Sequence, residues 1–517
     1  MRELTDRHWD AVVIGTGMGG GVAGRALAEA GLSVLFVEKG RAGWRREANG
    51  TEAATDPVAR GVRGLWPDPV TLRMGGRERE VFAPLGMGVG GSSVFYAATL
   101  ERPEPHDLDP SNAVPHPVGG WPVRYAAMAP WFDAAERMFA VRGGADPLSA
   151  VACPELGAAV VSDADRAMMA HLAGNGMHPY ALHAALRDVA GCASCLGRKC
   201  PRPCKMDGRS AGVEPALATG RAAMLDRCDV TRLVMDGNRV AGIEAVRDGA
   251  RVTLRAARVV LAAGALNSPL LLRRSACEGW ADGVANRSGM VGRNLMFHLN
   301  ETFAVWPKGA ERGDGPSKAV GFRDLYAVDG RRMGMVQAMG IDAGRGEIAH
   351  YMGQRIAGTW AARLPGARRV VQAGAVLAHG AMGRAKLFVG LLEDMPDAGN
   401  RVFEDRGRPG RIVVEYRVAD EAQVRRRMFR RAIRSAFAGR RMAFVNRGAE
   451  PNLGHPCGTV RMGDDPAVAP LDAGCRAHGI ENLWCVDAGV FPTSMGVNPS
   501  LTIAANALRV VEGMRHG

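Results

Sequence analysis

Residues 12–40 read VVIGTGMGGGVAGRALAEAGLSVLFVEKG, an apolar run, a glycine-rich turn, a helical segment and a second apolar run. Val12–Ile14 predicts a buried strand because it is short and apolar. Gly20–Ala30 has the composition of a helix, and Leu32–Val37 predicts the next strand. A strand, a glycine turn, a helix and a strand within about thirty residues are typical of a βαβ unit that binds a dinucleotide. We therefore expect an α/β fold with a Rossmann-like domain at the N-terminus.

The glycines of this turn fit the G-x-G-x-x-G pattern at Gly15, Gly17 and Gly20. Gly15 permits the tight turn, Gly17 lets a pyrophosphate approach the backbone, and Gly20 lets the helix pack on the strand. The helix N-terminus then offers unpaired N–H groups to the phosphates. Glu38, at the end of the second strand, is placed to bind a ribose diol. The unit as a whole predicts a dinucleotide site but does not distinguish NAD from FAD.

A second glycine cluster, GMGVGGSS at residues 86–93, favours FAD. NAD enzymes do not need such a loop, whereas a flavin needs backbone close to its ribityl chain and ring. The alternative is a flexible loop without a ligand. The apolar residues 94–96 that follow directly make this alternative the weaker one.

The bulk composition is that of an ordinary globular protein, with 47% hydrophobic and 23% charged residues. The formal net charge of +13 does not by itself indicate nucleic-acid binding, because aromatic residues make up only 6%. No signal peptide precedes the first strand. The longest apolar run, residues 369–391, is broken by Arg384 and Lys386, so we expect no membrane-spanning segment. These features predict a cytoplasmic protein whose cysteines are not paired in structural disulfides.

Two stretches near the C-terminus complete the pattern. Residues 454–465 read GHPCGTVRMGDD and residues 482–509 read NLWCVDAGVFPTSMGVNPSLTIAANALR. Together with the N-terminal turn, the GVGGSS loop and VVLAAGALNSPLLL at residues 259–272, they resemble the glucose–methanol–choline (GMC) flavoprotein oxidoreductases. The resemblance runs from about residue 8 to the end and is weakest in residues 130–185 and 305–390, where such enzymes shape their substrate sites. The likeness is greatest to bacterial sugar and alcohol dehydrogenase flavoprotein subunits.

The resemblance implies a GMC-type FAD-binding domain and a discontinuous substrate domain built on an antiparallel sheet. We expect the FAD-binding domain at residues 1–125, 205–300 and 445–517. The substrate domain is expected at residues 126–190 and 300–444, with a cysteine-rich loop at 191–205.

The resemblance also implies the roles of individual residues. His455 matches the histidine that takes the proton of the substrate hydroxyl, and Asn498 matches the second active-site residue. A histidine suits this role chemically because its pKa lies near neutrality without tuning. The residues expected to bind FAD are Gly15, Gly17, Gly20, Glu38, Gly90, Gly91, Ser92, Ser93, Val230, Asp487, Gly496 and Asn498. His298, in the stretch VGRNLMFHLN, resembles a histidine that commonly ends this family motif and is interpreted as structural.

The expected reaction is FAD-dependent oxidation of a primary or secondary alcohol, a sugar, polyol or natural-product hydroxyl, to a carbonyl. His455 would remove the proton, and hydride would pass to flavin N5. We expect a dehydrogenase that passes electrons to a protein or quinone-like acceptor. The alternatives are an oxidase that forms hydrogen peroxide, and a flavin-dependent lyase or non-catalytic flavoprotein. The residues that would select one alcohol carry no recognisable motif.

A cysteine-rich loop, CASCLGRKCPRPC at residues 192–204, stands apart from these motifs. Cys192, Cys195, Cys200 and Cys204 have the spacing C-x2-C-x4-C-x3-C, which differs from the ferredoxin pattern and lacks the histidines of common zinc fingers. The neighbouring basic residues favour thiolates. Some bacterial members of the family carry an iron–sulfur cluster in a cysteine-rich segment at about this place. An iron–sulfur cluster is the first hypothesis; a zinc site and plain thiols or a redox disulfide are the alternatives.

Residues 424–441, VRRRMFRRAIRSAFAGRR, predict an amphipathic helix. Val424, Met428, Phe429 and Ile433 fall on its apolar face, and most arginines fall on the other. A solvated helix packed on the core is the first interpretation. The alternative is a docking patch for an acidic electron acceptor or an anionic membrane.

Overall fold

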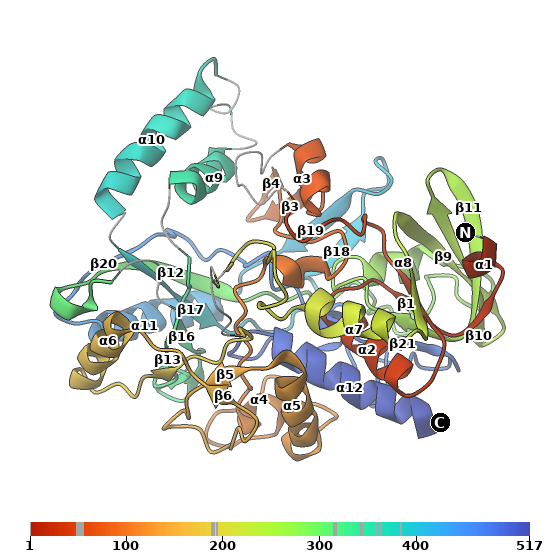
Figure 1. Ribbon diagram of the computed structural model, residues 1–517, viewed down its shortest axis with the longest axis horizontal. Coiled ribbons are helices and arrows are strands. Elements are labelled where there is room, and N and C mark those ends of the chain that lie inside the picture. Colours follow the sequence, from red (N-terminus) through yellow and green to blue (C-terminus); the bar gives the residue numbers. More distant parts are fainter. Residues whose placement is uncertain are drawn as a thin grey trace.

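The computed structural model describes residues 2–47, 56–187, 192, 195–313, 318–341, 345–356, 360, 364–382 and 385–516. Two large sheets lie on opposite sides of the molecule, and the C-terminal helix α12 (Ser500–His516) lies at its lower centre (Figure 1). The fold is mixed α/β, as the sequence predicts.

The N-terminal sheet has seven strands, in the order β8-β2-β1-β11-β10-β9 with β21 beside β11. The strands are β1 (His8–Ile14), β2 (Val34–Val37), β8 (Ala222–Leu225), β9 (Cys228–Asp236), β10 (Arg239–Arg247), β11 (Ala250–Leu261) and β21 (Leu483–Cys485). β1 runs parallel to both β2 and β11, and its residues 11–13 are completely buried. A parallel strand covered on both faces must be apolar throughout, which explains the continuous run Ala11–Ile14.

Helix α2 (Met18–Glu29) packs on this sheet and against α12. A methyl group on Gly19 would lie 2.0 Å from the carbonyl oxygen of Val486, and one on Gly21 would lie 2.4 Å from that of Gly208. The helix is rich in glycine because backbone segments from distant parts of the chain touch it on several sides.

The second large sheet is antiparallel, in the order β20-β12-β17-β16-β13-β7. Its strands are β7 (Tyr180–Ala181), β12 (Leu299–Trp306), β13 (Val320–Phe322), β16 (Val336–Ala338), β17 (Lys386–Leu392) and β20 (Arg441–Phe444). Helix α11 (Asp420–Ala436) covers it, with the ring of Phe429 lying against Gly390 of β17.

A four-stranded sheet joins these regions. Its order is β18-β19-β3-β4, with β3 (Val70–Met74), β4 (Arg77–Val81), β18 (Arg401–Glu404) and β19 (Ile412–Tyr416). Parallel pairing of β19 with β3 connects residues expected in the substrate domain to residues expected in the FAD-binding domain. The domain limits stated above therefore remain a prediction.

The other elements are short or connect the sheets. The helices are α1 (Arg2–Thr5), α3 (Pro57–Arg63), α4 (Pro105–Leu108), α5 (Tyr125–Phe139), α6 (Asp163–Gly174), α7 (Glu214–Ala218), α8 (Ser268–Arg274), α9 (Arg345–Ile356), α10 (Ala367–Met382), the 3-10 turns η1 (Gly91–Phe95), η3 (Gly309–Glu311) and η5 (Ala488–Val490), and the π-helix η2 (Gly208–Val213). The short strands are β5 (Arg142–Gly143), β6 (Gly157–Ala158), β14 (Ala327–Val328) and β15 (Arg331–Arg332). Among the described residues, no helix has the length and apolar character needed to cross a membrane.

Helix α11 differs from its prediction in two ways. It begins earlier than residue 424, and two of its arginines point inward. Arg425 is buried and donates to the carbonyl oxygens of Arg332 (2.9 Å) and Glu393 (2.7 Å), and Arg426 pairs with the buried Glu301. The helix is therefore tied to the core by its charges, and these arginines are not available as a docking patch.

Candidate active site

A cavity of about 410 Å³ opens between the N-terminal sheet and the C-terminal segment. The cavity is lined by the turn after β1, the end of β2, the 86–93 loop and η1, together with residues from the segments 262–274, 452–456 and 487–503. The predicted residues that line it are Gly15, Gly17, Glu38, Gly91, Ser92, Ser93, Val230, His455, Asp487 and Asn498. Segments that are far apart in the sequence therefore meet at one site.

The glycine turn is built as the motif predicts. Gly15 has φ of +97°, and a methyl group there would lie 2.4 Å from the carbonyl oxygen of Ala262. A methyl group on Gly20 would lie 2.1 Å from the carbonyl oxygen of Gly15. Gly17 differs from both, because a methyl group there meets no atom of the described chain within 4 Å. Packing explains Gly15 and Gly20, whereas Gly17 keeps the cavity open at the N-terminus of α2.

Glu38 is buried at the cavity wall and is held by three hydrogen bonds. Its carboxylate accepts from the backbone N–H of Thr16 (3.2 Å), the hydroxyl of Thr16 (2.5 Å) and the backbone N–H of Gly40 (2.9 Å). Burial raises the pKa of the Glu38 carboxyl, and these hydrogen bonds oppose the shift. The side chain is thus fixed in position at the end of β2, where a ribose would be recognised.

Asp487 also lines the cavity, and its carboxylate is held by three hydrogen bonds. Its carboxylate accepts from the backbone N–H groups of Gly264 (2.9 Å) and Gly489 (2.8 Å) and from the hydroxyl of Ser268 (2.5 Å). The expected contribution of Asp487 to cofactor binding is therefore structural, because its oxygens hold the 264–268 turn against η5. Burial raises the pKa of this carboxyl.

Three predicted cofactor residues do not line the cavity. Gly20 and Gly90 serve the packing and turning of the two glycine loops; Gly90 has φ of +92°. Gly496 lies against Tyr326, whose ring a methyl group would meet at 2.6 Å. Packing therefore explains why a glycine stands at position 496. Its carbonyl oxygen accepts a hydrogen bond from the N–H of Met335 (3.0 Å), the residue before β16 of the second large sheet.

His455 and His298 form a pair beside the cavity. Their Nδ1 atoms lie 3.0 Å apart and their rings meet edge to face. The Nε2 atom of His298 lies 3.0 Å from the carbonyl oxygen of Met495. The interpretation of His298 as a purely structural histidine overlooked this contact, since nothing in the local sequence shows that residues 298 and 455 meet.

The pair determines which nitrogen of His455 carries a proton. A carbonyl oxygen only accepts, so His298 donates from Nε2 and its Nδ1 is a lone pair. His455 must then donate from Nδ1, which leaves the lone pair on Nε2. Burial, together with the neighbouring His298, lowers the pKa of His455 to about 3, and burial lowers the pKa of His298 to about 4. Both rings are therefore neutral at physiological pH, and His455 presents an unprotonated Nε2.

This arrangement makes His298 a positioning residue, and its replacement tests that role. His298→Leu removes the acceptor for Nδ1 of His455 and should slow substrate-dependent reduction of the flavin by about 10–100-fold. His298→Gln should restore most of the rate, because an amide can donate to Met495 and accept from His455. Equal rates in the two variants would contradict the tautomer argument.

The pH dependence gives a second measurement. Protonation of His455 would remove the base as the pH falls through its pKa of about 3. The rate of flavin reduction in the wild type should therefore not fall between pH of about 8 and 5. In His298→Leu the loss of the neighbouring ring should move the acid limb upward, because that ring contributes to the lowered pKa.

Asn498 supplies the second polar group. Its Oδ1 is buried and has no hydrogen-bond partner within the described residues, although the side chain lines the cavity. A buried polar atom without a partner is unfavourable unless a ligand completes it. Asn498 is therefore placed to bind a ligand at the same end of the cavity as His455.

The cysteine loop packs against the wall of this cavity. The backbone N–H of Gly197 donates to the carbonyl oxygen of Tyr96 (3.3 Å), and Tyr96 lines the cavity. Lys205 is completely buried beneath the loop and donates to the carbonyl oxygens of Val94 (2.9 Å) and Tyr96 (3.3 Å). Burial lowers the pKa of the Lys205 ammonium to about 8. The loop is thus anchored to the segment that carries η1.

The thiols contact one another in series. The sulfurs of Cys200 and Cys204 are 3.2 Å apart, those of Cys192 and Cys204 are 3.8 Å apart, and Cys195 is hydrogen-bonded to Cys200. A zinc ion needs each sulfur at about 2.3 Å from one shared centre. In the described part of the chain, no three or more His, Cys, Asp or Glu side chains are arranged to hold a metal ion. No metal site is thus found among the described residues, and the iron–sulfur and zinc hypotheses gain no support here.

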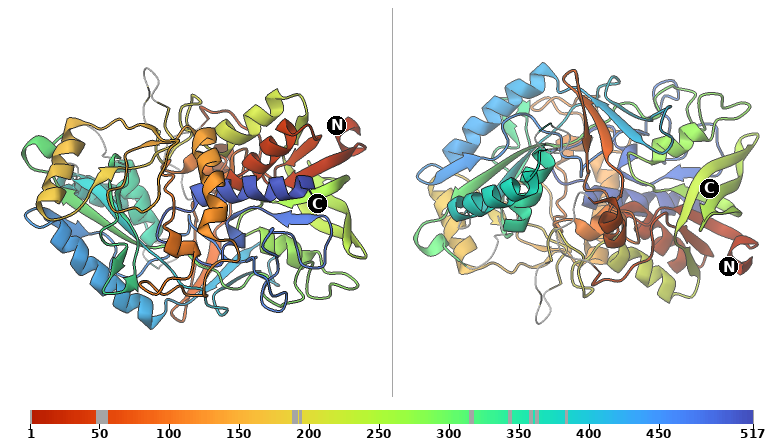
Figure 2. Two further views of the ribbon diagram at one scale, coloured as in Figure 1. Left: turned by 90° about the horizontal axis from the view of Figure 1, so that it is seen from below. Right: turned by 90° about the horizontal axis from the view of Figure 1, so that it is seen from above.

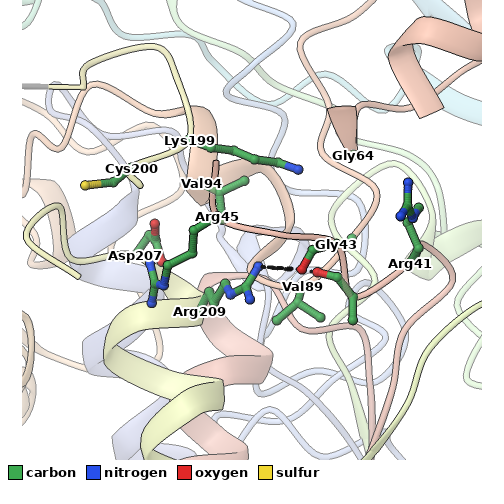
Figure 3. Close-up of a pocket in the computed structure, with 12 residues that line it drawn as sticks. Arg41, Gly43, Arg45, Gly64, Val89, Val94, Lys199, Cys200, Asp207 and Arg209 are labelled. Carbon is green, nitrogen blue, oxygen red and sulfur yellow. Dashed lines mark hydrogen bonds between the residues drawn. The ribbon is translucent and has the colours of Figure 1, made fainter. Parts of the chain in front are cut away.

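A small cavity beside the loop is lined by basic side chains (Figure 3). They are Arg41, Arg45, Lys199 and Arg209. Glu47 pairs with Arg41 (2.7 Å) and lies 3.9 Å from Lys199, and Glu214 pairs with Arg45 and with Arg209 (2.8 Å). Two carboxylates thus serve four basic groups, and each basic group has one of them as an ion-pair partner.

The sequence is similar to those of known oxidoreductases. Family models described as GMC oxidoreductase match residues 10–300 and 377–507. The chain is 29% identical to paromamine 6'-oxidase of Streptomyces fradiae and 30% identical to 6'''-hydroxyparomomycin C oxidase of Streptomyces lividus, in each case over 98% of this chain and 91% of the relative. It is 26% identical to 2-methyl-1,2-propanediol dehydrogenase of Mycolicibacterium austroafricanum, over 97% of this chain and 94% of that protein.

Solved structures share the fold at lower identity. Pyridoxine 4-oxidase from Mesorbium loti superposes with a TM-score of 0.66 at 20% identity, covering 99% of this chain and 100% of that one. Formate oxidase from Aspergillus oryzae superposes with a TM-score of 0.68 at 16% identity, covering 98% of each chain. These likenesses concern the fold alone.

Proposed function

This chain belongs to the GMC oxidoreductase family, and we propose that it oxidises a hydroxyl group of a sugar, polyol or natural product to a carbonyl, with His455 as the base. The observation that supports this most directly is that His455, paired with His298 through Nδ1, lines the same cavity as Asn498, whose Oδ1 has no partner among the described residues. Two relatives, at 29% and 30% identity, are named paromamine 6'-oxidase and 6'''-hydroxyparomomycin C oxidase.

The family uses FAD, and the cavity fits this cofactor. Gly17 leaves the N-terminus of α2 open toward the space where a pyrophosphate would be held. Glu38, which follows β2, would bind the ribose, and Val230, which also lines the cavity, would contact the adenine. Ser92 and Ser93, at the start of η1, and Asn498 also line the cavity and would hold the flavin portion.

The chain's own residues would manage the proton and the orientation of the substrate. Bound FAD supplies the acceptor for the hydride. Nε2 of His455 accepts the hydroxyl proton, and the resulting positive charge is shared with His298 through the Nδ1–Nδ1 hydrogen bond. The amide of Asn498 orients the hydroxyl but cannot take its proton, because an amide does not titrate in water.

Anaerobic reduction of the bound flavin tests the reaction without any assumption about the acceptor. We expect one or more compounds in a panel of sugars, amino sugars, polyols, sterols and aryl alcohols to bleach the flavin absorbance. Stopped-flow absorbance would give the rate for each. A protein whose flavin no alcohol reduces would instead be a lyase or a non-catalytic flavoprotein.

The electron acceptor is either oxygen or a separate molecule, and the names of the relatives support both alternatives. The two relatives at 29% and 30% identity are named oxidases, which favours oxygen and hydrogen peroxide as its product. The relative at 26% identity is named a dehydrogenase, which favours a separate protein or quinone-like acceptor. Oxygen consumption with peroxide release during turnover supports the first. Turnover only with an added dye supports the second.

The thiol contacts predict a redox reaction in the cysteine loop. Burial raises the pKa of the Cys200 thiol, but hydrogen bonds from the Lys205 backbone and from Cys204 outweigh it, so the net pKa is lowered. Burial and the contact with Cys200 raise the pKa of Cys204 to about 12. Diamide, which removes two electrons and two protons from a dithiol, should therefore join Cys200 to Cys204 before other pairs.

Peptide mapping by mass spectrometry would detect this disulfide, which Cys200→Ser should abolish and Cys485→Ser should leave intact. Metal analysis completes the test. Iron with acid-labile sulfide in anaerobically purified protein, lost in Cys200→Ser, would contradict the thiol interpretation and support the iron–sulfur cluster. Zinc lost in the same variant would instead support a structural ion.

A further inference from the structure

Helices α9 and α10 project from the body of the protein. Figure 1 shows them at the upper left, and Figure 2 shows α10 from above, on the side of the molecule away from α12. α9 lies along α10, where the methyl group of Met352 meets the backbone at Gly374. Most of this hairpin, residues 345–376, lies between the two matched family regions. None of the described residues of this hairpin is among those that line the candidate active site.

The outer face of α10 is apolar and exposed. Val370 is 71% exposed, Val376 is 48% exposed and Leu377 is 76% exposed. Residues 370, 373, 377 and 381 follow one another at helical spacing, and all four are Val, Ala or Leu. Trp360 and Leu364, just before the helix, are 75% and 50% exposed. The surface defined by Trp360, Leu364, Val370, Val376 and Leu377 is called the outer stripe.

The inner face of α10 is apolar as well. Ala375 is buried at 1% exposure, and Val371, Gly374 and Ala378 are partly buried on the same side. The helix contains no acidic residue, and its arginines, at 368 and 369, both lie in its first turn. A helix that is apolar on both faces is stable when both are covered. α9 covers the inner face, whereas no described residue covers the outer stripe.

The charge around the stripe indicates what covers it. Residues 345–384 contain six arginines, at 345, 355, 363, 368, 369 and 384, and one acidic residue, Glu347. Of these arginines, Arg345 and Arg369 have described side chains, which are exposed at the starts of α9 and α10. An apolar helical face with basic residues nearby and a tryptophan near one end is the pattern of a helix that lies in a membrane interface. The excess of positive charge complements anionic lipid headgroups.

The length of α10 agrees with binding along a membrane rather than across it. At about 1.5 Å per residue its sixteen residues extend about 24 Å, less than the roughly 30 Å of a hydrocarbon core. Two arginines of α11, a helix that the sequence also offered for such a role, are engaged in the core: Arg425 and Arg426.

We propose that the outer stripe docks the protein on an anionic phospholipid surface, as a peripheral anchor. Docking buries Leu377 and Val370 at the boundary of headgroups and acyl chains and places the surrounding arginines among the phosphates. The proposal does not depend on the reaction proposed above.

Vesicle flotation with the FAD-loaded protein tests this proposal. Vesicles of phosphatidylglycerol and phosphatidylcholine should carry the protein upward, and pure phosphatidylcholine vesicles should carry at least about tenfold less, with binding falling as salt rises. The double variant Val370→Glu/Leu377→Glu should lose at least about tenfold of the binding to anionic vesicles. Val160→Glu, at a 66% exposed apolar residue outside the hairpin, is the matched control and should bind like the wild type.

Flavin content, circular dichroism and the anaerobic reduction rate should be unchanged in both variants, because the altered side chains project from the surface. Failure of the wild type to float with anionic vesicles at low salt would overturn the proposal. Full binding by the double variant would do the same. A concentration-dependent dimer in light scattering that the double variant abolishes would show that a second copy of the chain covers the stripe, which also overturns it.

Discussion

His455→Ala should slow the reduction of the bound flavin by substrate about 10²–10⁴-fold, the usual contribution of a positioned base. The imidazole of His455 lines the cavity, has an unprotonated Nε2, and donates a hydrogen bond from Nδ1 to Nδ1 of His298. Without it the hydroxyl proton would have to leave to water during hydride transfer. Single-turnover reduction under anaerobic conditions measures this step without interference from the acceptor.

Three controls make the result specific. FAD content should be unchanged, because the histidine lies at one end of a cavity with more than forty lining residues. Asn498→Ala should reduce the rate less, since the amide orients the hydroxyl and does not take the proton. An alanine variant that reduces its flavin at the wild-type rate would remove His455 from the mechanism while leaving the fold and the cofactor site intact.

Gly17→Val should weaken FAD binding by about 10²–10⁴-fold while the protein still folds. No described atom lies within 4 Å of a methyl group at this position, so the valine has room in the protein alone. The space it takes is where the pyrophosphate would approach the N–H groups of α2. Loss of two hydrogen bonds to a charged group, about 1.5–3 kcal/mol each, accounts for a change of this size.

Gly20→Ala provides the contrast. Its methyl group would lie 2.1 Å from the carbonyl oxygen of Gly15, so the turn itself must shift. We expect a lower unfolding temperature for the apoprotein of Gly20→Ala and an unchanged one for Gly17→Val, measured by calorimetry. Fluorescence titration with FAD gives the affinity. Wild-type affinity in Gly17→Val would show that the turn does not hold the pyrophosphate.

The N-terminal unit could be predicted from sequence because its causes are local. The strand at residues 12–14, the turn at Gly15 and the helix that follows depend on apolar periodicity and on the absence of side chains at fixed intervals. The structure places β1, α2 and β2 as that pattern requires. The shared order of the later motifs was sufficient for the family, which the comparisons confirm.

Helix α11 shows where periodicity is insufficient. Its helical character was predictable, yet the pattern placed the arginines in solvent. Arg425 and Arg426 are buried because Glu301 and the carbonyl oxygens of Arg332 and Glu393, all on other elements, receive their guanidinium groups. A buried charge depends on partners elsewhere in the chain, and helical spacing carries no record of them.

Local sequence thus established the class of fold, the family, and the residues at which a dinucleotide and a base were to be expected. The tertiary structure alone decided that His298 lies 3.0 Å from His455 and determines its tautomer, that the cysteine sulfurs contact in series, and that α10 has one uncovered face. The physical reason is the separation along the sequence over which the interacting residues lie. Turns and helices arise from interactions over a few residues, whereas proton positions, thiol geometry and exposure depend on how the folded chain arranges atoms in space. His298 and His455, which determine the proton positions, are 157 residues apart.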